Sequence, residues 1–222
     1  MSLDKYLPKA DHYTRTGGLG IGLAGAHRTG KTTTAQMLSE LNNFPVLTNV
    51  GSDLAAQMGI DMSKPMTLSQ RLDYQEARLD VTEEAYQGVK GELFVADRTP
   101  LDLAAYLVAE TPNALDQETI DRIEAYIQRC IDMANKYFGF FAFFRPTLPY
   151  VSAPGKPPAN TAYQQLISIL ISGLLVDSRV RRNFIAIPLQ MNNREDRVNM
   201  IADYANEYLD EVKSHFQSFP TC

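Results

Sequence analysis

Residues 25–32 read GAHRTGKT and match the spacing G-x-x-x-x-G-K-[ST], which places two glycines, a lysine and a hydroxyl at fixed intervals. Glycine at positions 25 and 30 allows backbone conformations that other residues avoid, so successive amide groups can approach an anion closely. A helix that begins after the second glycine adds the positive end of its dipole. We therefore expect the phosphates of ATP to be held by Gly25, Ala26, His27, Arg28, Thr29, Gly30, Lys31, Thr32 and Thr33.

Two side chains of this loop have chemistry of their own. Lys31 supplies a mobile cation for the β- and γ-phosphates, and the hydroxyl of Thr32 is suited to ligate Mg²⁺. The flanks agree, because residues 19–24 form a short apolar run typical of a buried strand and residues 32–38 begin a helical pattern. An ordinary glycine turn before a helix is the alternative, and the two matching flanks make it the weaker one.

An acid and a base follow a second apolar run. Residues 93–96 read LFVA, and Asp97 and Arg98 come directly after them. In a parallel sheet this places both at the carboxyl edge, where the glycine loop also lies. Asp97 can hold Mg²⁺ or accept a proton from an attacking hydroxyl, and Arg98 can neutralise the charge of a phosphoryl group. The alternative is a helix start, with Asp97 as the cap and Arg98 paired locally, and both can hold together. The candidate catalytic residues are Lys31, Asp97 and Arg98.

Features that the chain lacks favour transfer over hydrolysis. Mechanical ATPases commonly place a glutamate after the strand aspartate, whereas Arg98 stands here. The Asn-Lys-x-Asp motif of G domains is also missing, since the segment 135–138 reads NKYF. We therefore expect a bound acceptor, rather than water, to receive the phosphoryl group.

The elements that must position these residues alternate between strands and helices. Strands are predicted at 19–24, 45–48, 92–96, 138–144 and 183–188, and helices near 31–41, 68–87, 101–110, 117–136, 163–176 and 194–216. This alternation is typical of an α/β fold with crossover helices. We predict a P-loop NTPase three-layer fold, with a parallel sheet of about five strands and helices on both faces.

Two further segments are candidates for nucleotide contacts. Residues 145–162 are rich in proline, follow a predicted strand, and form either a lid-like loop that brings Lys156 to the substrate or a plain surface crossover. Arginines cluster at positions 179–182, where Arg179 and Arg182 either clamp the phosphates of ATP or decorate a solvated turn.

The composition of the chain limits its possible binding partners and its expected compartment. The chain of 222 residues has a formal net charge of −5, which argues against a broad nucleic-acid surface but leaves room for a local basic groove. Its two cysteines predict no disulfide framework, and no apolar run reaches the length of a membrane span, so a cytoplasmic protein is expected. Residues 1–17 show no clear periodicity and are predicted to form an arm before one domain of residues 18–222.

Taken together, these motifs resemble small P-loop kinases of nucleosides and nucleotides, in particular the ribosylnicotinamide-kinase-like group and phage deoxynucleotide or modified-base kinases. The resemblance covers roughly residues 18 to 210 and rests on the glycine loop, on Tyr74-Gln75-Glu76-Ala77-Arg78-Leu79, on Asp97-Arg98-Thr99-Pro100-Leu101-Asp102 with Tyr106, and on Arg194-Glu195-Asp196-Arg197. It implies that Asp97 and Arg98 serve the acceptor and Mg²⁺, and that Arg71, Gln75 and Arg78 line the acceptor pocket. These three share one helix face by their spacing, although a solvated charged face would show the same spacing.

The resemblance therefore implies an ATP-dependent, Mg²⁺-dependent kinase of a nucleoside or deoxynucleotide, of the type found in phage nucleotide metabolism. A kinase of a 5-hydroxymethylated pyrimidine base within DNA is one alternative, and a nucleotide-dependent ATPase or switch subunit is another. The apolar residues 166–175 predict either buried core or the face of a homodimer.

Overall fold

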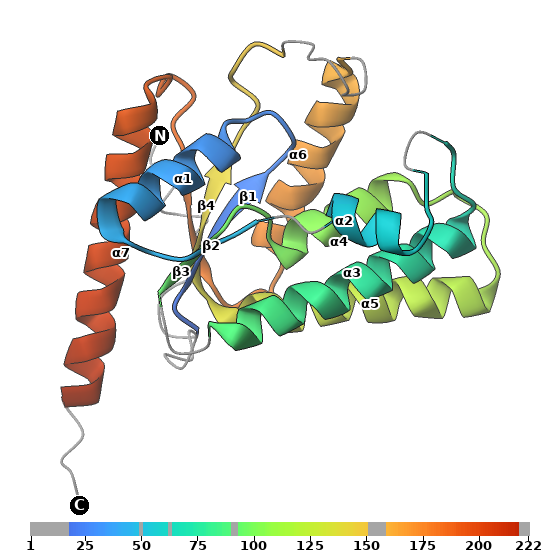
Figure 1. Cartoon of the computed structure of the whole chain (residues 1–222), viewed down its shortest axis with the longest axis horizontal. Coiled ribbons are helices and arrows are strands. Elements are labelled where there is room, and N and C mark those ends of the chain that lie inside the picture. Colours follow the sequence, from blue (N-terminus) through green and yellow to red (C-terminus); the bar gives the residue numbers. More distant parts are fainter. Residues whose placement is uncertain (1–17, 49–50, 62–63, 90–92, 151–158, 218–222) are drawn as a thin grey trace, which may run out of the picture.

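The computed structural model describes residues 18–48, 51–61, 64–89, 93–150 and 159–217. Within these residues, five strands form one all-parallel sheet in the order β2-β3-β1-β4-β5 (Figure 1). The strands are β1 (Gly20–Gly25), β2 (Val46–Leu47), β3 (Phe94–Ala96), β4 (Phe138–Phe144) and β5 (Asn183–Ala186). The predicted parallel sheet is therefore confirmed.

Helices cover both faces of this sheet, which gives the three layers that the sequence predicts. The helices are α1 (Lys31–Asn42), α2 (Gly51–Gln57), α3 (Leu68–Gly88), α4 (Pro100–Ala109), α5 (Gln117–Tyr137), α6 (Thr161–Leu175) and α7 (Arg194–Gln217). Helices α1 and α7 lie on one side of the sheet, and α3, α4, α5 and α6 lie on the other (Figure 1). Within the described residues, no helix combines the length and the apolar character that crossing a membrane requires.

Strand β4 supplies both cores because its side chains alternate between the two faces. Phe140 and Phe144 pack with α1 and α7, whereas Phe141 and Phe143 pack with the α3–α6 layer. The pairing of β1 with β4 shifts register near Gly139, so Phe138 joins the same face as Phe141. A Cβ at Gly139 would lie 2.4 Å from the ring of Tyr208, so a side chain at this position would displace that ring.

Most predicted elements are found close to their predicted bounds. Helix α2 was not predicted, and β2, β3 and β5 are shorter than predicted. Of the predicted lid-like segment, residues 151–158 lie outside the described residues, and α6 already begins at Thr161. The predicted arm of residues 1–17 also lies outside them. In α6, Ile167 and Ile171 are fully buried while Ile169 is 66% exposed, so one face of this helix belongs to the core.

Candidate active site

The glycine loop joins the end of β1 to the start of α1 and is shaped by its two glycines. Gly25 has φ 152° and Gly30 has φ 94°, conformations that side chains with a Cβ rarely adopt. A Cβ at Gly25 would also lie 2.5 Å from the carbonyl oxygen of Phe144. Gly30 is the N-cap of α1 and no side chain caps this helix, so its first-turn amides are oriented to receive an anion.

Lys31 is buried and folds back over the loop. Its Nζ donates to the carbonyl oxygens of Gly25 at 2.5 Å and Ala26 at 2.7 Å. Burial lowers the pKa of Lys31 to about 8, against the effect of Asp102, which raises it. The ammonium group is therefore held inside the loop by two backbone carbonyl oxygens.

Thr32 and Asp97 lie together, as the sequence predicts for a metal site. The Thr32 hydroxyl donates to Oδ2 of Asp97 at 2.8 Å, which joins the start of α1 to the end of β3. A hydroxyl and a carboxylate are hard oxygen donors that suit Mg²⁺, which usually takes one or two protein oxygens and completes its shell with water and phosphate. The pair therefore fits the predicted ion.

His27 does not present its backbone N–H to a phosphate as the prediction requires. Its N–H donates to the hydroxyl of Tyr106 at 3.0 Å, and its carbonyl oxygen accepts from Gln164 at 2.7 Å. Burial, with the nearby cations Arg98, Lys31 and Arg28, lowers the pKa of His27 to about 4. His27 is thus a neutral imidazole that anchors the loop to α4 and α6.

Asp102 is a second anchor of the loop on α4. Its Oδ1 accepts the backbone N–H of Gly25 at 2.9 Å, and its Oδ2 accepts the backbone N–H of Thr99 at 2.8 Å. Thr99, not Asp97, is the N-cap of α4, and Asp102 completes the capping box. The predicted helix start is therefore present, but its cap lies two residues after Asp97, and the Asp97 carboxylate accepts from Thr32 instead.

Arg98 is held against the face of Tyr106, with its guanidinium carbon 4.8 Å from the ring centroid. Burial opposes its charge, yet Tyr106, Asp102 and Asp97 together keep the pKa of Arg98 above its ordinary value. A partly buried, permanently charged guanidinium next to Asp97 can stabilise negative charge on a transferring group.

Arg197, on α7, supports the loop from the other side of the sheet. It is only 2% exposed, and it donates to the carbonyl oxygens of Met191 at 2.7 Å and Thr29 at 3.2 Å. Burial lowers its pKa. A Cβ at Gly30 would lie 3.1 Å from its guanidinium, so the second glycine of the motif also makes room for Arg197.

The three predicted acceptor residues all lie on α3, but their surroundings differ. Gln75 and Arg78 are buried, and Tyr126 donates to Gln75 at 3.4 Å. Arg71 forms an ion pair with Glu110 of α4. Arg78 and Arg98 reach one small pocket of about 20 Å³ whose lining residues are Leu47, Thr48, Arg78, Thr82, Ala85, Tyr86, Arg98 and Leu103. Arg78 therefore lines the pocket beside Arg98, while Arg71 joins α3 to the C-terminal end of α4.

Arg179 and Arg182 lie at the opposite edge of the sheet, so the prediction that they clamp ATP phosphates is not supported. They precede β5 and hence lie at the amino ends of the parallel strands, whereas the glycine loop follows β1 at the carboxyl ends. Arg179 pairs with Asp177 at 2.9 Å, and Arg182 donates to the carbonyl oxygen of Asn135. Lys156 lies outside the described residues.

A parallel sheet whose β1 leads through a glycine loop into α1 defines a P-loop NTPase fold. A family model described as an AAA domain matches residues 21–135, just over half of the chain, and the chain belongs to that family. No protein of curated function matches the chain.

Solved structures agree with this fold. The chain is similar to deoxyadenosine kinase from M. mycoides (TM-score 0.57, 16% identity, 85% of this chain and 98% of that one). It is also similar to thymidylate kinase from Candida albicans (TM-score 0.59, 14% identity, 86% and 93%). A third similar structure is NadR in complex with NR (TM-score 0.60, 14% identity, 87% and 51%), of which this chain spans about half. At these identities the likeness establishes the fold alone.

Proposed function

We propose that this protein is an ATP-dependent kinase that transfers the γ-phosphoryl group to a nucleoside or deoxynucleotide. The observation that carries the proposal is the meeting of Lys31, the Thr32–Asp97 pair and Arg98 at one edge of the sheet, beside a pocket lined by Arg78. Phosphoryl transfer depends mainly on positioning and on charge stabilisation, and these residues supply both.

Each group has a place in this proposal. The first-turn amides of α1 and the Lys31 ammonium hold the phosphates, and Thr32 and Asp97 hold Mg²⁺, which neutralises phosphate charge when bound. Arg98, which lies against the ring of Tyr106, lines the acceptor pocket and stabilises charge on the transferring group. In this proposal Asp97 also accepts the proton of the acceptor hydroxyl.

The pocket beside Arg98 is the proposed acceptor site. Its volume of about 20 Å³ is room for about one water, so its lining side chains must move to admit a base. Gln75 and Arg78 offer an amide and a guanidinium on the buried face of α3, groups that hydrogen-bond to the edge of a base or to a phosphate. A wider hollow of about 650 Å³ lies near the starts of α3 and α5, away from these residues, and has no part in the proposal.

The two alternatives are less well supported. A kinase acting on a base within DNA needs a basic groove at the site, and Arg179 and Arg182, the arginines that suggested one, lie at the other edge. An ATPase needs a group that orients water, whereas the position after Asp97 is an arginine.

A product screen tests the proposal. The protein is incubated with Mg-ATP and deoxynucleosides, ribonucleosides, their monophosphates, and DNA with plain or hydroxymethylated bases, and products are measured by mass spectrometry. We expect one phosphoryl mass to be added to a nucleoside or a monophosphate. ATP consumption with no modified acceptor would favour the ATPase or switch function instead, and modified DNA would favour the base kinase.

A further inference from the structure

Tyr106 lies on the second turn of α4 and meets the glycine loop through its hydroxyl. The oxygen accepts the His27 backbone N–H at 3.0 Å and lies 2.9 Å from Nδ1 of the same residue. A phenol hydroxyl has one proton to donate and lone pairs to accept, so both contacts are satisfied when it donates to Nδ1. This assigns the remaining imidazole proton to Nε2.

The same side chain meets the acceptor side through its ring. The guanidinium of Arg98 lies over the ring face at 4.8 Å, and Arg98 lines the pocket that also contains Arg78. A guanidinium on an aromatic face is held in one orientation, and the contact is stronger where water is excluded. The ring therefore fixes the direction in which Arg98 points.

Two side chains on one face of α4 form hydrogen bonds with the backbone of the loop. Asp102 and Tyr106 are four residues apart, so they lie one above the other on the helix. Asp102 accepts the N–H of Gly25, Tyr106 accepts the N–H of His27, and Gln164 of α6 donates to the His27 carbonyl. The loop backbone before Arg28 is thus fixed by side chains on two helices.

We propose that Tyr106 is a positioning residue that joins the two halves of the site: its hydroxyl sets the phosphate loop at His27, and its ring sets Arg98 toward the acceptor. The inference rests on the proposed function and adds to it that the hydroxyl and the ring of Tyr106 serve different parts of the site. Removing the hydroxyl disturbs mainly the ATP side, because the hydroxyl holds His27 and adds only one of several interactions that support the charge of Arg98. Removing the ring also removes the surface that orients Arg98.

Two substitutions and one control separate these effects. Tyr106→Phe keeps the ring and loses the hydroxyl, and Tyr106→Leu loses both. Tyr163→Phe is the control, because Tyr163 belongs to the same aromatic group but its hydroxyl donates to Glu110 at 2.8 Å rather than to the loop. The dissociation constant for Mg-ATP is measured by calorimetry. The KM of an acceptor is measured at saturating Mg-ATP with whichever of deoxyadenosine, deoxycytidine and dTMP the wild type phosphorylates.

We expect Tyr106→Phe to weaken Mg-ATP binding about five- to tenfold and to change the acceptor KM by no more than about twofold. We expect Tyr106→Leu to raise the acceptor KM by a further factor of about ten. Tyr163→Phe should change neither quantity more than about twofold.

Unchanged Mg-ATP affinity in Tyr106→Phe would overturn the inference, and so would an equal rise of the acceptor KM in both Tyr106 variants. If the wild type binds Mg-ATP but phosphorylates none of the three probes, the Mg-ATP affinities alone decide. If the wild type does not bind Mg-ATP, the proposed function itself is overturned, and this inference with it.

Discussion

His27 belongs to the glycine loop by position, but two helices hold its peptide group and its ring. Its N–H and Nδ1 meet Tyr106 and its carbonyl meets Gln164, while the ring of Tyr150 lies edge-on at 5.5 Å. Three cations, Arg98, Lys31 and Arg28, oppose its protonation. The loop is therefore stabilised by an imidazole that has to stay neutral.

This requirement predicts a dependence of stability on pH. In the folded protein the pKa of His27 is lowered from 6.5 to about 4, so between these values the unfolded chain binds a proton that the folded chain does not. The free energy of unfolding therefore falls as the pH falls from about 6.5 to 4. Because His27 is only half-buried, solvent screening limits this contribution to on the order of 1 kcal/mol.

The measurement compares the wild type with His27→Asn, whose side-chain oxygen can still accept from Tyr106 but does not titrate. Urea unfolding at pH 7, 5.5 and 4.5 should show the wild type losing more stability than the variant toward acid. Carboxylates titrate in both proteins and cancel in the comparison. Parallel losses in the two proteins would contradict the account of His27.

The sequence predicts single site residues where a short stretch of neighbouring residues marks them. Lys31 and Thr32 follow from a motif of eight residues, and Asp97 follows from a strand end. The anchors were not predictable, because Asp102 and Tyr106 meet the loop across 77 and 79 residues of chain, and Arg197 meets it across 168. These three residues stand in the motifs that carry the family resemblance, but short-range patterns do not show that they contact the loop.

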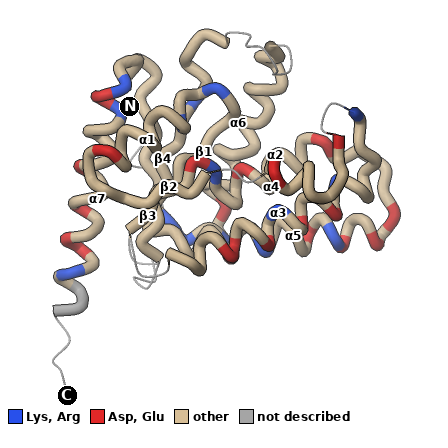
Figure 2. The backbone as a smooth tube through the Cα atoms, in the orientation of Figure 1, with Lys and Arg blue, Asp and Glu red and all other residues tan. Residues whose placement is uncertain are grey.

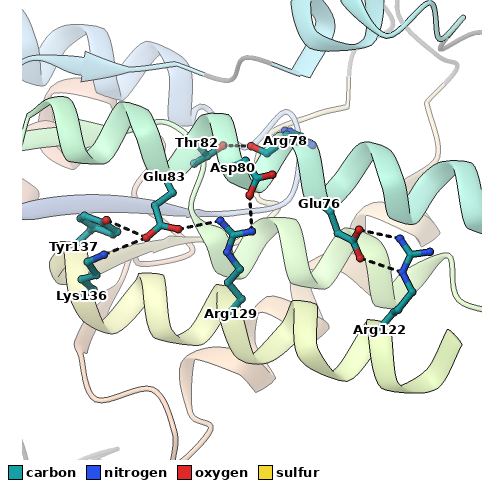
Figure 3. Close-up of polar contacts among 9 residues, drawn as sticks. All are labelled: Glu76, Arg78, Asp80, Thr82, Glu83, Arg122, Arg129, Lys136 and Tyr137. Atoms are coloured by element: carbon teal, nitrogen blue, oxygen red, sulfur yellow. Dashed lines mark hydrogen bonds and ion pairs between the residues drawn. The ribbon is translucent and has the colours of Figure 1, made fainter. Parts of the chain in front are cut away.

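At the scale of elements, α3 and α5 are joined by a ladder of ion pairs (Figure 3). Arg122, Arg129 and Lys136 are spaced by seven residues on α5 and face carboxylates of α3 with the same spacing. Arg122 pairs with Glu76 at 2.8 Å, and Lys136 pairs with Glu83 at 3.1 Å. Charged residues recur along both helices (Figure 2), and the side chains of these ion pairs are partly exposed. Helix α3 thereby keeps Gln75 and Arg78 on its inner face.

Removing the central ion pairs, those of Arg129, should lower the free energy of unfolding only slightly, and the loss should depend on salt. Arg129 pairs with Asp80 at 2.6 Å and Glu83 at 2.9 Å, and its side chain is 40% exposed. Arg129→Met is expected to lower the free energy of unfolding by about 0.5–1 kcal/mol at low ionic strength and by less in about 1 M salt.

Chemical denaturation at the two salt concentrations measures this effect. Lys213→Met is the matched control, because Lys213 pairs with Asp210 within α7 and joins no second helix. A loss in Arg129→Met that is the same at both salt concentrations would show that packing of the arginine stem, rather than its charge, is responsible.

Elements with a clear period were predictable, and short ones were not. The bounds predicted for α3, α5 and β4 are met within a residue. Helix α2 has seven residues and is held by tertiary contacts, with Leu54 and Ala55 packed on Tyr74 and the Tyr74 hydroxyl donating to the carbonyl of Gly51. Its sequence alone is too short to signal a helix. The order of the strands likewise follows from packing that no local pattern records.

For the whole molecule, the sheet separates two cores, and Cys130 lies in the larger one. Its side chain is 0% exposed on α5, and burial raises the pKa of its thiol to about 12. A thiol with so little thiolate, and without solvent access, reacts only when the fold opens.

Thiol labelling can therefore report on the integrity of this core. In a Cys222→Ser variant, Ellman's reagent at pH 8 should label Cys130 at least a thousandfold more slowly than in urea. Rapid labelling of the folded protein would show that the α3–α6 layer opens locally and would contradict the packing described.

The central claim is that the carboxyl edge of the sheet binds ATP through the glycine loop and Lys31. Calorimetric titration with Mg-ATP, for the wild type and for Lys31→Ala, tests it most directly, with thermal unfolding of both proteins to show that the fold is kept. The account predicts one site in the wild type and an affinity at least about a hundredfold weaker in the variant, because the buried cation is lost. Equal affinities in two folded proteins would contradict it.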